Sequence, residues 1–155
     1  MTLFLVCDTS GSMSEGGKPF ITRTAVMTIA QWIYLMGGQE QIRLCAWGSE
    51  AVFSDWTMND DYPEHMLVCS GTSSATALTR LLGDSPDGTV LLLTDGFWSS
   101  TETRHLKQWR AGLPYDSVRF IKIGADANPQ LKGPDVFLAE DLFAALNGWL
   151  EAPSA

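Results

Sequence analysis

Short apolar runs alternate along this chain with longer segments whose apolar residues recur at helical spacing. A brief continuous apolar run bounded by turn residues is typical of a strand buried on both faces, and a 3.6-residue period is typical of a helix packed on such a sheet. The predicted strands are 3–7, 41–47, 89–94, 118–123 and 136–138. The predicted helices are 19–36, 76–82, 99–111 and 140–150.

This alternation predicts one α/β domain over residues 1–155, in which an open, mostly parallel central sheet carries helices on both faces. Residues 51–53 are the exception, because three residues separate them from the strand 41–47 and a parallel crossover needs about a dozen or more. We expect 51–53 to form a short antiparallel hairpin partner of that strand. In open parallel sheets ligands bind beyond the carboxyl ends of the strands, so a functional site is expected at that edge.

Two of the most apolar strands run directly into an aspartate. Asp8 follows the run LFLVC, and Asp95 follows the run VLLLT. A carboxylate at the tip of a buried strand is partly desolvated, so it needs a cation or hydrogen-bond donors beside it. Both aspartates therefore mark the edge of the sheet at which a ligand is expected.

Hydroxyl side chains accompany these aspartates. Asp8 opens the segment DTSGS, where a tight turn brings its carboxylate and the hydroxyls of Ser10 and Ser12 toward one point. A further turn, GTSS at 71–74, offers more hydroxyl oxygen, although its two serines fit helix N-caps better than ligands. Oxygen-only ligands, two ionised and the rest neutral, suit Mg²⁺, with Mn²⁺ or Ca²⁺ as alternatives.

At this point the sequence resembles the von Willebrand factor A domains, whose metal-ion-dependent adhesion site has the same three-part pattern. The pattern consists of Asp8-x-Ser10-x-Ser12, a threonine in a GT turn, and a distal Asp-Gly after an apolar strand. The resemblance covers the whole chain and implies a Rossmann-like, three-layer fold with one short antiparallel edge strand, which matches 51–53. The metal ligands that it implies are Asp8, Ser10, Ser12, Thr72 and Asp95.

The chemistry of such a site points to binding and not to catalysis. Two carboxylates at most neutralise a divalent cation and hydroxyls add no charge, so the ion stays electrophilic. The resemblance implies that an open position on the ion accepts a Glu or Asp from a partner protein. We therefore expect a non-enzymatic, cation-dependent adaptor module. For stand-alone intracellular members from bacteria, the resemblance adds a stress or defence system with an ATPase, kinase or phosphatase partner.

The alternative is a Mg²⁺-dependent phosphohydrolase that uses Asp8 as its nucleophile. Phosphatases of the haloacid dehalogenase type also place an aspartate at a strand tip, but they need a second aspartate two residues later, where this chain has Ser10. No lysine stands just before the strand end at Asp95 in the way that phosphate binding would want. A phosphate-binding P-loop is absent as well, because Gly17-Lys18 is followed by Pro19.

The charge, the apolar runs and the cysteines of the chain indicate which classes of partner are disfavoured. The 155 residues include 10 Lys plus Arg and 18 Asp plus Glu, a net charge of −8, which disfavours a protein that tracks nucleic-acid phosphates. No apolar run approaches the length of a membrane span. The cysteines Cys7, Cys45 and Cys69 lie in or beside apolar runs without the spacing of a zinc site. We expect reduced thiols, a cytoplasmic location, and neither nucleic-acid nor membrane binding.

Aromatic residues fall into two groups. Trp32, Trp109 and Trp149 lie on predicted helices at spacings that suit core packing, and the last helix is expected to turn Phe143 inward as well. Phe97-Trp98 differ, because they follow Asp95-Gly96 directly and so belong to the rim of the predicted metal site. Exposed aromatics there would anchor a partner; folding back over the end of the sheet is the other interpretation.

Overall fold

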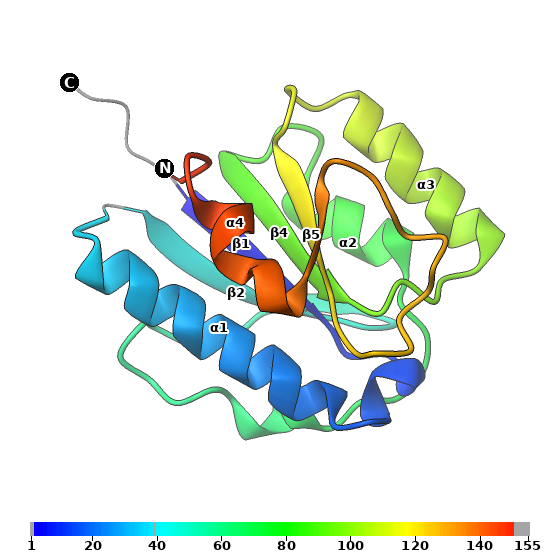
Figure 1. Cartoon of the computed structure of the whole chain (residues 1–155). Helices are drawn as coiled ribbons and strands as arrows, with labels where there is room; N and C mark the ends of the chain where they lie inside the picture. The colour runs from blue at the N-terminus through cyan, green and yellow to red at the C-terminus, as the bar shows by residue number, and fades with distance from the viewer. Residues whose placement is uncertain (1, 39, 151–155) are drawn as a thin grey trace.

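Six strands form one sheet in the order β3-β2-β1-β4-β5-β6 (Figure 1). The structure is a computed structural model that describes residues 2–38 and 40–150. Neighbouring strands pair in parallel except β2 and β3, which confirms the predicted parallel sheet with its antiparallel edge strand. The strands are β1 (Thr2–Asp8), β2 (Gln41–Trp47), β3 (Ala51–Phe53), β4 (Gly88–Thr94), β5 (Val118–Lys122) and β6 (Val136–Leu138).

Helices cover both faces of the sheet, as predicted. Figure 1 shows α1 and α4 on one face and α2 and α3 on the other. Because successive side chains of a strand point to opposite faces, β1 turns Leu3 and Leu5 toward α1 and turns Phe4 and Val6 toward α2 and α3. The helices are α1 (Lys18–Leu35), α2 (Ala75–Leu82), α3 (Ser100–Ala111) and α4 (Leu142–Leu146), with 3₁₀ turns η1 (Gly11–Ser14), η2 (Glu64–Leu67) and η3 (Ala139–Asp141).

Serine caps begin α2 and α3. Ser74 accepts a hydrogen bond from the backbone N–H of Ala77 at 3.2 Å, which confirms its predicted role as a helix cap. Ser99 accepts one from the N–H of Glu102, also at 3.2 Å. The carboxylate of Glu102 bonds to the N–H of Ala75, at the start of α2. One acidic side chain therefore joins the first turns of two helices and satisfies an orphan donor of α2.

The closing helix is shorter than predicted. The sequence predicts a helix over 140–150, whereas α4 ends at Leu146 and the chain turns at Gly148 with a φ of +77°. Phe143 is 52% exposed, so the prediction that it faces inward is wrong. Trp149 lies beyond the helix and is half-buried, and its indole N–H donates to the carbonyl of Asp116 at 2.7 Å. No helix among residues 2–38 and 40–150 is long and apolar enough to cross a membrane.

Thiol labelling is expected to divide the three cysteines. Cys7 and Cys45 are buried, and burial raises the pKa of each thiol to about 12, so neither forms the reactive thiolate near neutral pH. Cys69 is partly exposed. We expect iodoacetamide at pH 8 to modify Cys69 first in the folded protein and all three thiols in guanidinium, as measured by intact-mass spectrometry. Equally fast labelling of Cys7 in the folded protein would contradict this packing of β1.

Candidate metal centre

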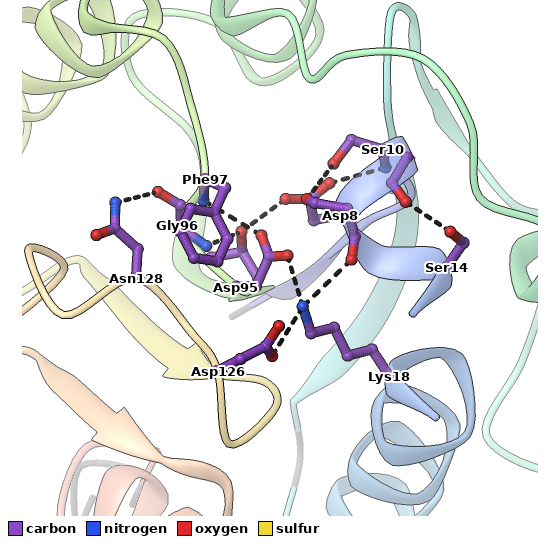
Figure 2. Close-up of polar contacts among 12 residues, drawn as sticks. Asp8, Ser10, Ser14, Lys18, Asp95, Gly96, Phe97, Asp126 and Asn128 are labelled. Carbon is purple, nitrogen blue, oxygen red and sulfur yellow. Dashed lines mark hydrogen bonds and ion pairs between the residues drawn. The ribbon is translucent and has the colours of Figure 1, made fainter. Parts of the chain in front are cut away.

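The two predicted aspartates meet at one edge of the sheet. β1 and β4 are parallel neighbours with Cys7 opposite Leu93, so Asp8 and Asp95 emerge side by side from the carboxyl ends of these strands (Figure 2). Asp8 is 2% exposed and Asp95 is fully buried. The sequence pattern predicted this meeting, because parallel strands that end in aspartate must place both carboxylates at the same edge.

Three donors orient the carboxylate of Asp8. Its Oδ1 accepts from the backbone N–H of Ser10 at 2.9 Å and from the hydroxyl of Ser73 at 2.8 Å. Its Oδ2 accepts from the hydroxyl of Thr94 at 2.6 Å. An ionised carboxylate offers about four acceptor positions, so one remains for another ligand. Ser73, for which the sequence predicted a helix cap, is instead a support of Asp8.

Two serine hydroxyls lie beside this carboxylate. The Oγ atoms of Ser10 and Ser12 are 3.5 Å apart. Neighbouring oxygens on an octahedral Mg²⁺ lie about 2.9–3.0 Å apart, so the two hydroxyls would have to approach by about 0.5 Å to share that ion. The turn is held by the N–H of Gly11, which donates to the carbonyl of Gly71 at 2.8 Å. A Cβ atom at Gly11 would lie 3.4 Å from that carbonyl oxygen, an ordinary van der Waals contact, so this backbone hydrogen bond and not the lack of a side chain joins the two turns.

Thr72 follows in the turn that contacts Gly11. Thr72 is exposed and directly precedes Ser73, which bonds to Asp8. Gly71 adopts a φ of +73°, a left-handed conformation that glycine accepts at little cost and that directs the chain past the site. The assignment of Asp8, Ser10, Ser12, Thr72 and Asp95 as metal ligands stays a prediction, and their donor chemistry fits a hard divalent cation.

A buried lysine, which sequence reasoning missed, lies against Asp95. Lys18 is 1% exposed, and its Nζ donates to Asp95 Oδ2 at 3.1 Å (Figure 2). The same ammonium contacts Asp126 Oδ1 at 3.0 Å and the carbonyl of Ser12 at 3.2 Å. Burial lowers the pKa of Lys18, but the hydrogen bonds to Asp126 and Asp95 raise it more, so the net pKa lies above its ordinary value. The ammonium is therefore charged at neutral pH.

One signal in the sequence pointed to this lysine. Lys18 stands in the first turn of α1, directly before Pro19. A cation there opposes the helix dipole, which favours negative charge at the N-terminus. An unfavourable charge at a helix start indicates that another group holds it, and here that group is Asp95.

The candidate donors at this edge of the sheet are oxygens, the ligand type for which the sequence predicts a hard divalent cation. Asp8 and Asp95 are the acids at the centre, and no group of three or more His, Cys, Asp or Glu that could hold a metal is found within the described part of the chain. The remaining donors are neutral hydroxyls. Together the two aspartates carry −2, and Lys18 reduces this sum to −1.

Phe97 and Trp98, the aromatic pair at the rim of the predicted site, lie in different surroundings. Trp98 folds back between Trp47 and Phe120, with ring centroids 5.6 Å and 6.2 Å away. Phe97 is 47% exposed, and its ring centroid lies 5.8 Å from the Nζ of Lys18. Trp98 is half-buried, so Phe97 presents the more exposed ring of the two residues predicted to contact a partner, and that contact stays a prediction.

No protein-family model matches the sequence, and neither does any curated protein. Solved structures do match the fold, among them a von Willebrand factor type A protein from Catenulispora acidiphila, with 15% identity, a TM-score of 0.60, and coverage of 91% of this chain and 39% of that one. Manganese-loaded TRAP from Plasmodium vivax matches with 18% identity, a TM-score of 0.59, and coverage of 97% and 73%.

Proximal thread matrix protein 1 from the mussel byssus, with a zinc-occupied MIDAS motif, matches with 15% identity and a TM-score of 0.56. The match covers 93% of this chain and 44% of that protein, so this chain spans less than half the length of two of the three structures. The element order, the parallel sheet and its antiparallel edge strand agree with these likenesses. This chain has the Rossmann-like α/β fold of the von Willebrand factor A domains.

Proposed function

We propose that this chain is a divalent-cation-dependent protein-interaction module without catalytic residues. The observation that carries the proposal is the meeting of Asp8 and Asp95 with the paired hydroxyls of Ser10 and Ser12 at the carboxyl end of the sheet. Metal-loaded forms of two proteins with the same fold, one with zinc in a MIDAS motif and one with manganese, support a divalent cation. Magnesium is our proposal for the resident ion because every proposed ligand is an oxygen.

The proposed ligands are Asp8, Ser10, Ser12, Thr72 and Asp95. When bound, the cation supplies an electrophilic position that accepts a carboxylate oxygen. The protein's own residues orient the site: Thr94 and Ser73 fix the carboxylate of Asp8, and the exposed ring of Phe97 offers apolar contact beside it. A chain of net charge −8 would repel an acidic partner without a local positive charge.

The proposed partner is therefore a protein that supplies a Glu or Asp side chain. The proposed role is that of a cytoplasmic adaptor in a bacterial stress or defence system, beside an ATPase, kinase or phosphatase, and this rests on analogy with other proteins of this fold. The competing function is phosphate ester hydrolysis with Asp8 as nucleophile. This chain has Ser10 where phosphatases of the haloacid dehalogenase type need a second aspartate, and the three donors of the nearby Lys18 are occupied by protein oxygens and not free for a phosphate, which favours binding over turnover.

The double variant Ser10→Ala/Ser12→Ala is expected to lower Mn²⁺ affinity at least about tenfold, because it removes two proposed ligands. It leaves the hydrogen bonds to Asp8 in place, since Ser10 donates through its backbone. Asp8→Ala is a poorer probe, because it would leave the buried hydroxyls of Ser73 and Thr94 without their acceptor. Isothermal titration calorimetry with Mn²⁺ measures the change.

Ser14→Ala is the matched control, because Ser14 lies in the same turn but bonds only to the carbonyl of Gly11. It should bind Mn²⁺ as the wild type does. In pull-downs with the full chain as bait, a partner should be retained with Mg²⁺ and lost with chelator or with the double serine variant. A partner kept in every condition would overturn the cation-dependent function. Hydrolysis of a generic phosphomonoester that is lost in Asp8→Asn would favour the enzyme instead.

A further inference from the structure

The ammonium of Lys18 occupies a fully built site within the proposed metal centre. Its three N–H donors meet three oxygens, one each from Asp95, Asp126 and the carbonyl of Ser12, at 3.0–3.2 Å. The side chain is 1% exposed, so water takes little part in holding the charge. Figure 2 shows the ammonium between the carboxylates of Asp95 and Asp126, on the side of Asp95 away from Phe97's backbone.

The loop after β5 is shaped around the stem of this lysine. Gly124 has a φ of +96°, and a Cβ atom there would lie 2.6 Å from Cε and 3.2 Å from Cγ of Lys18. Asn128 ties the same loop to the end of β4, because its backbone N–H donates to the carbonyl of Asp95 at 2.8 Å and its amide donates to that of Gly96 at 3.0 Å. The path of Lys18 is thus fixed by close packing and by a loop that is anchored to Asp95 itself.

Lys18 and a divalent cation would draw on the same negative charge. Asp95 Oδ2 already accepts from the ammonium, and Asp8 and Asp95 are the acids proposed to hold the cation. Removing the ammonium would change the summed charge of Asp8, Asp95 and Lys18 from −1 to −2. Two cations close together in a buried setting repel each other more strongly than they would in water.

We propose that Lys18 is an internal cation that competes with the divalent metal for Asp95 and keeps the metal affinity of this site low. This inference rests on the proposed metal-dependent function and names its regulation. Asp126 holds the second side of the ammonium and is 64% exposed, so it adds one negative charge that favours both cations. A purely structural ion pair would stabilise the fold without any effect on metal affinity, and the two roles are therefore separable by measurement.

The test is a Mn²⁺ titration of the full chain by calorimetry, with Lys18→Met compared with the wild type. Methionine retains most of the stem that packs on Gly124 while removing the charge. The expected result is a dissociation constant at least about tenfold lower in Lys18→Met, together with a larger Mn²⁺-induced rise in melting temperature. Lys107→Met makes the same charge change on the exposed face of α3 and should leave the affinity as in the wild type.

Two further variants keep the test decisive. Lys18→Gln retains a hydrogen-bond donor toward Asp95 and serves if Lys18→Met does not fold. Asp126→Asn in the Lys18→Met background removes a negative charge without loosening an ammonium, so it should weaken Mn²⁺ binding by about threefold relative to Lys18→Met, the opposite direction to the lysine substitution.

The outcomes distinguish failure of the proposed lysine–metal competition from failure of the proposed metal-dependent function. Equal Mn²⁺ affinity in the wild type and in both Lys18 variants would overturn the competition and leave the metal site standing. Absence of Mn²⁺ binding in all of them would overturn both. Binding that appears only when Lys18 is neutralised would uphold the competition and overturn the metal-dependent function, because the lysine would then replace the metal in the natural protein.

Discussion

Trp98→Ala is expected to lower the free energy of unfolding by roughly 2–3 kcal/mol, below the cost of truncating a fully buried tryptophan, while its neighbour Phe97→Ala changes it by less than about 0.5 kcal/mol. The half-buried indole of Trp98 is packed between Trp47 and Phe120, so truncation removes its contacts with both rings. The ring of Phe97 is 47% exposed and loses little packing. Urea denaturation followed by circular dichroism measures both changes.

Trp98→Phe is the matched variant for this prediction. The indole N–H of Trp98 is buried without a hydrogen-bond partner, so replacing the indole by a phenyl ring breaks no hydrogen bond. We expect a cost below about 1.5 kcal/mol. If Trp98→Ala proved as harmless as Phe97→Ala, Trp98 would not be a core residue and its predicted role as a partner contact would return.

Gly88→Ala is expected to destabilise the fold by at least about 4 kcal/mol, the range in which a single substitution signals a specific steric conflict. Gly88 begins β4 opposite Thr2 of β1, and a Cβ atom there would overlap the carbonyl oxygen of Thr2. Thr2 and Gly88 are the first residues of the two central strands, so moving either backbone aside disturbs the pairing at which both strands begin. The loss would fall on the β1–β4 pair, which carries Asp8 and Asp95, and denaturant titration measures it.

Gly83→Ala provides the comparison within the same loop. Gly83 has a φ of +79° with no atom within 4 Å of an added Cβ, so alanine there adds only backbone strain of about 1–2 kcal/mol. A Gly88→Ala variant no less stable than Gly83→Ala would show that β4 does not begin against Thr2. The difference between the two variants isolates the clash from the left-handed conformation.

The strands and most helices were predictable because their signals are local. β2 and β6 have the predicted bounds, and α1, α2 and α3 begin or end within one residue of them. The last helix was overpredicted because the apolar period continues past its end: Leu150 is buried although the helix stops at Leu146. At the end of the chain the spacing of apolar residues therefore reflects which side chains are buried against the sheet. It does not show that the backbone is helical, because the helix has ended before Gly148.

The meeting of Asp8 and Asp95 was equally predictable, since strand ends alone determine it. The partners of these carboxylates were not. The position of Lys18 at a helix start indicates that some group pairs with its charge, but which groups do so depends on where the loop with Asp126 lies. Ser73 likewise became a donor to Asp8 because the turn at Gly71 crosses the first turn, which no local pattern encodes.

Because β1 is a central strand, one of its two partner strands is synthesised long after β1 itself. β1 pairs in parallel with β2 on one side and with β4 on the other, and the contact between Asp8 and Thr94 spans 86 positions. At about 5–20 residues per second, a ribosome needs roughly 4–17 s to add that interval. During this time the side of β1 that pairs with β4 has no partner strand, and Asp8 lacks the hydroxyl of Thr94. A slower stretch of translation before β4 would lengthen the exposure of that flank.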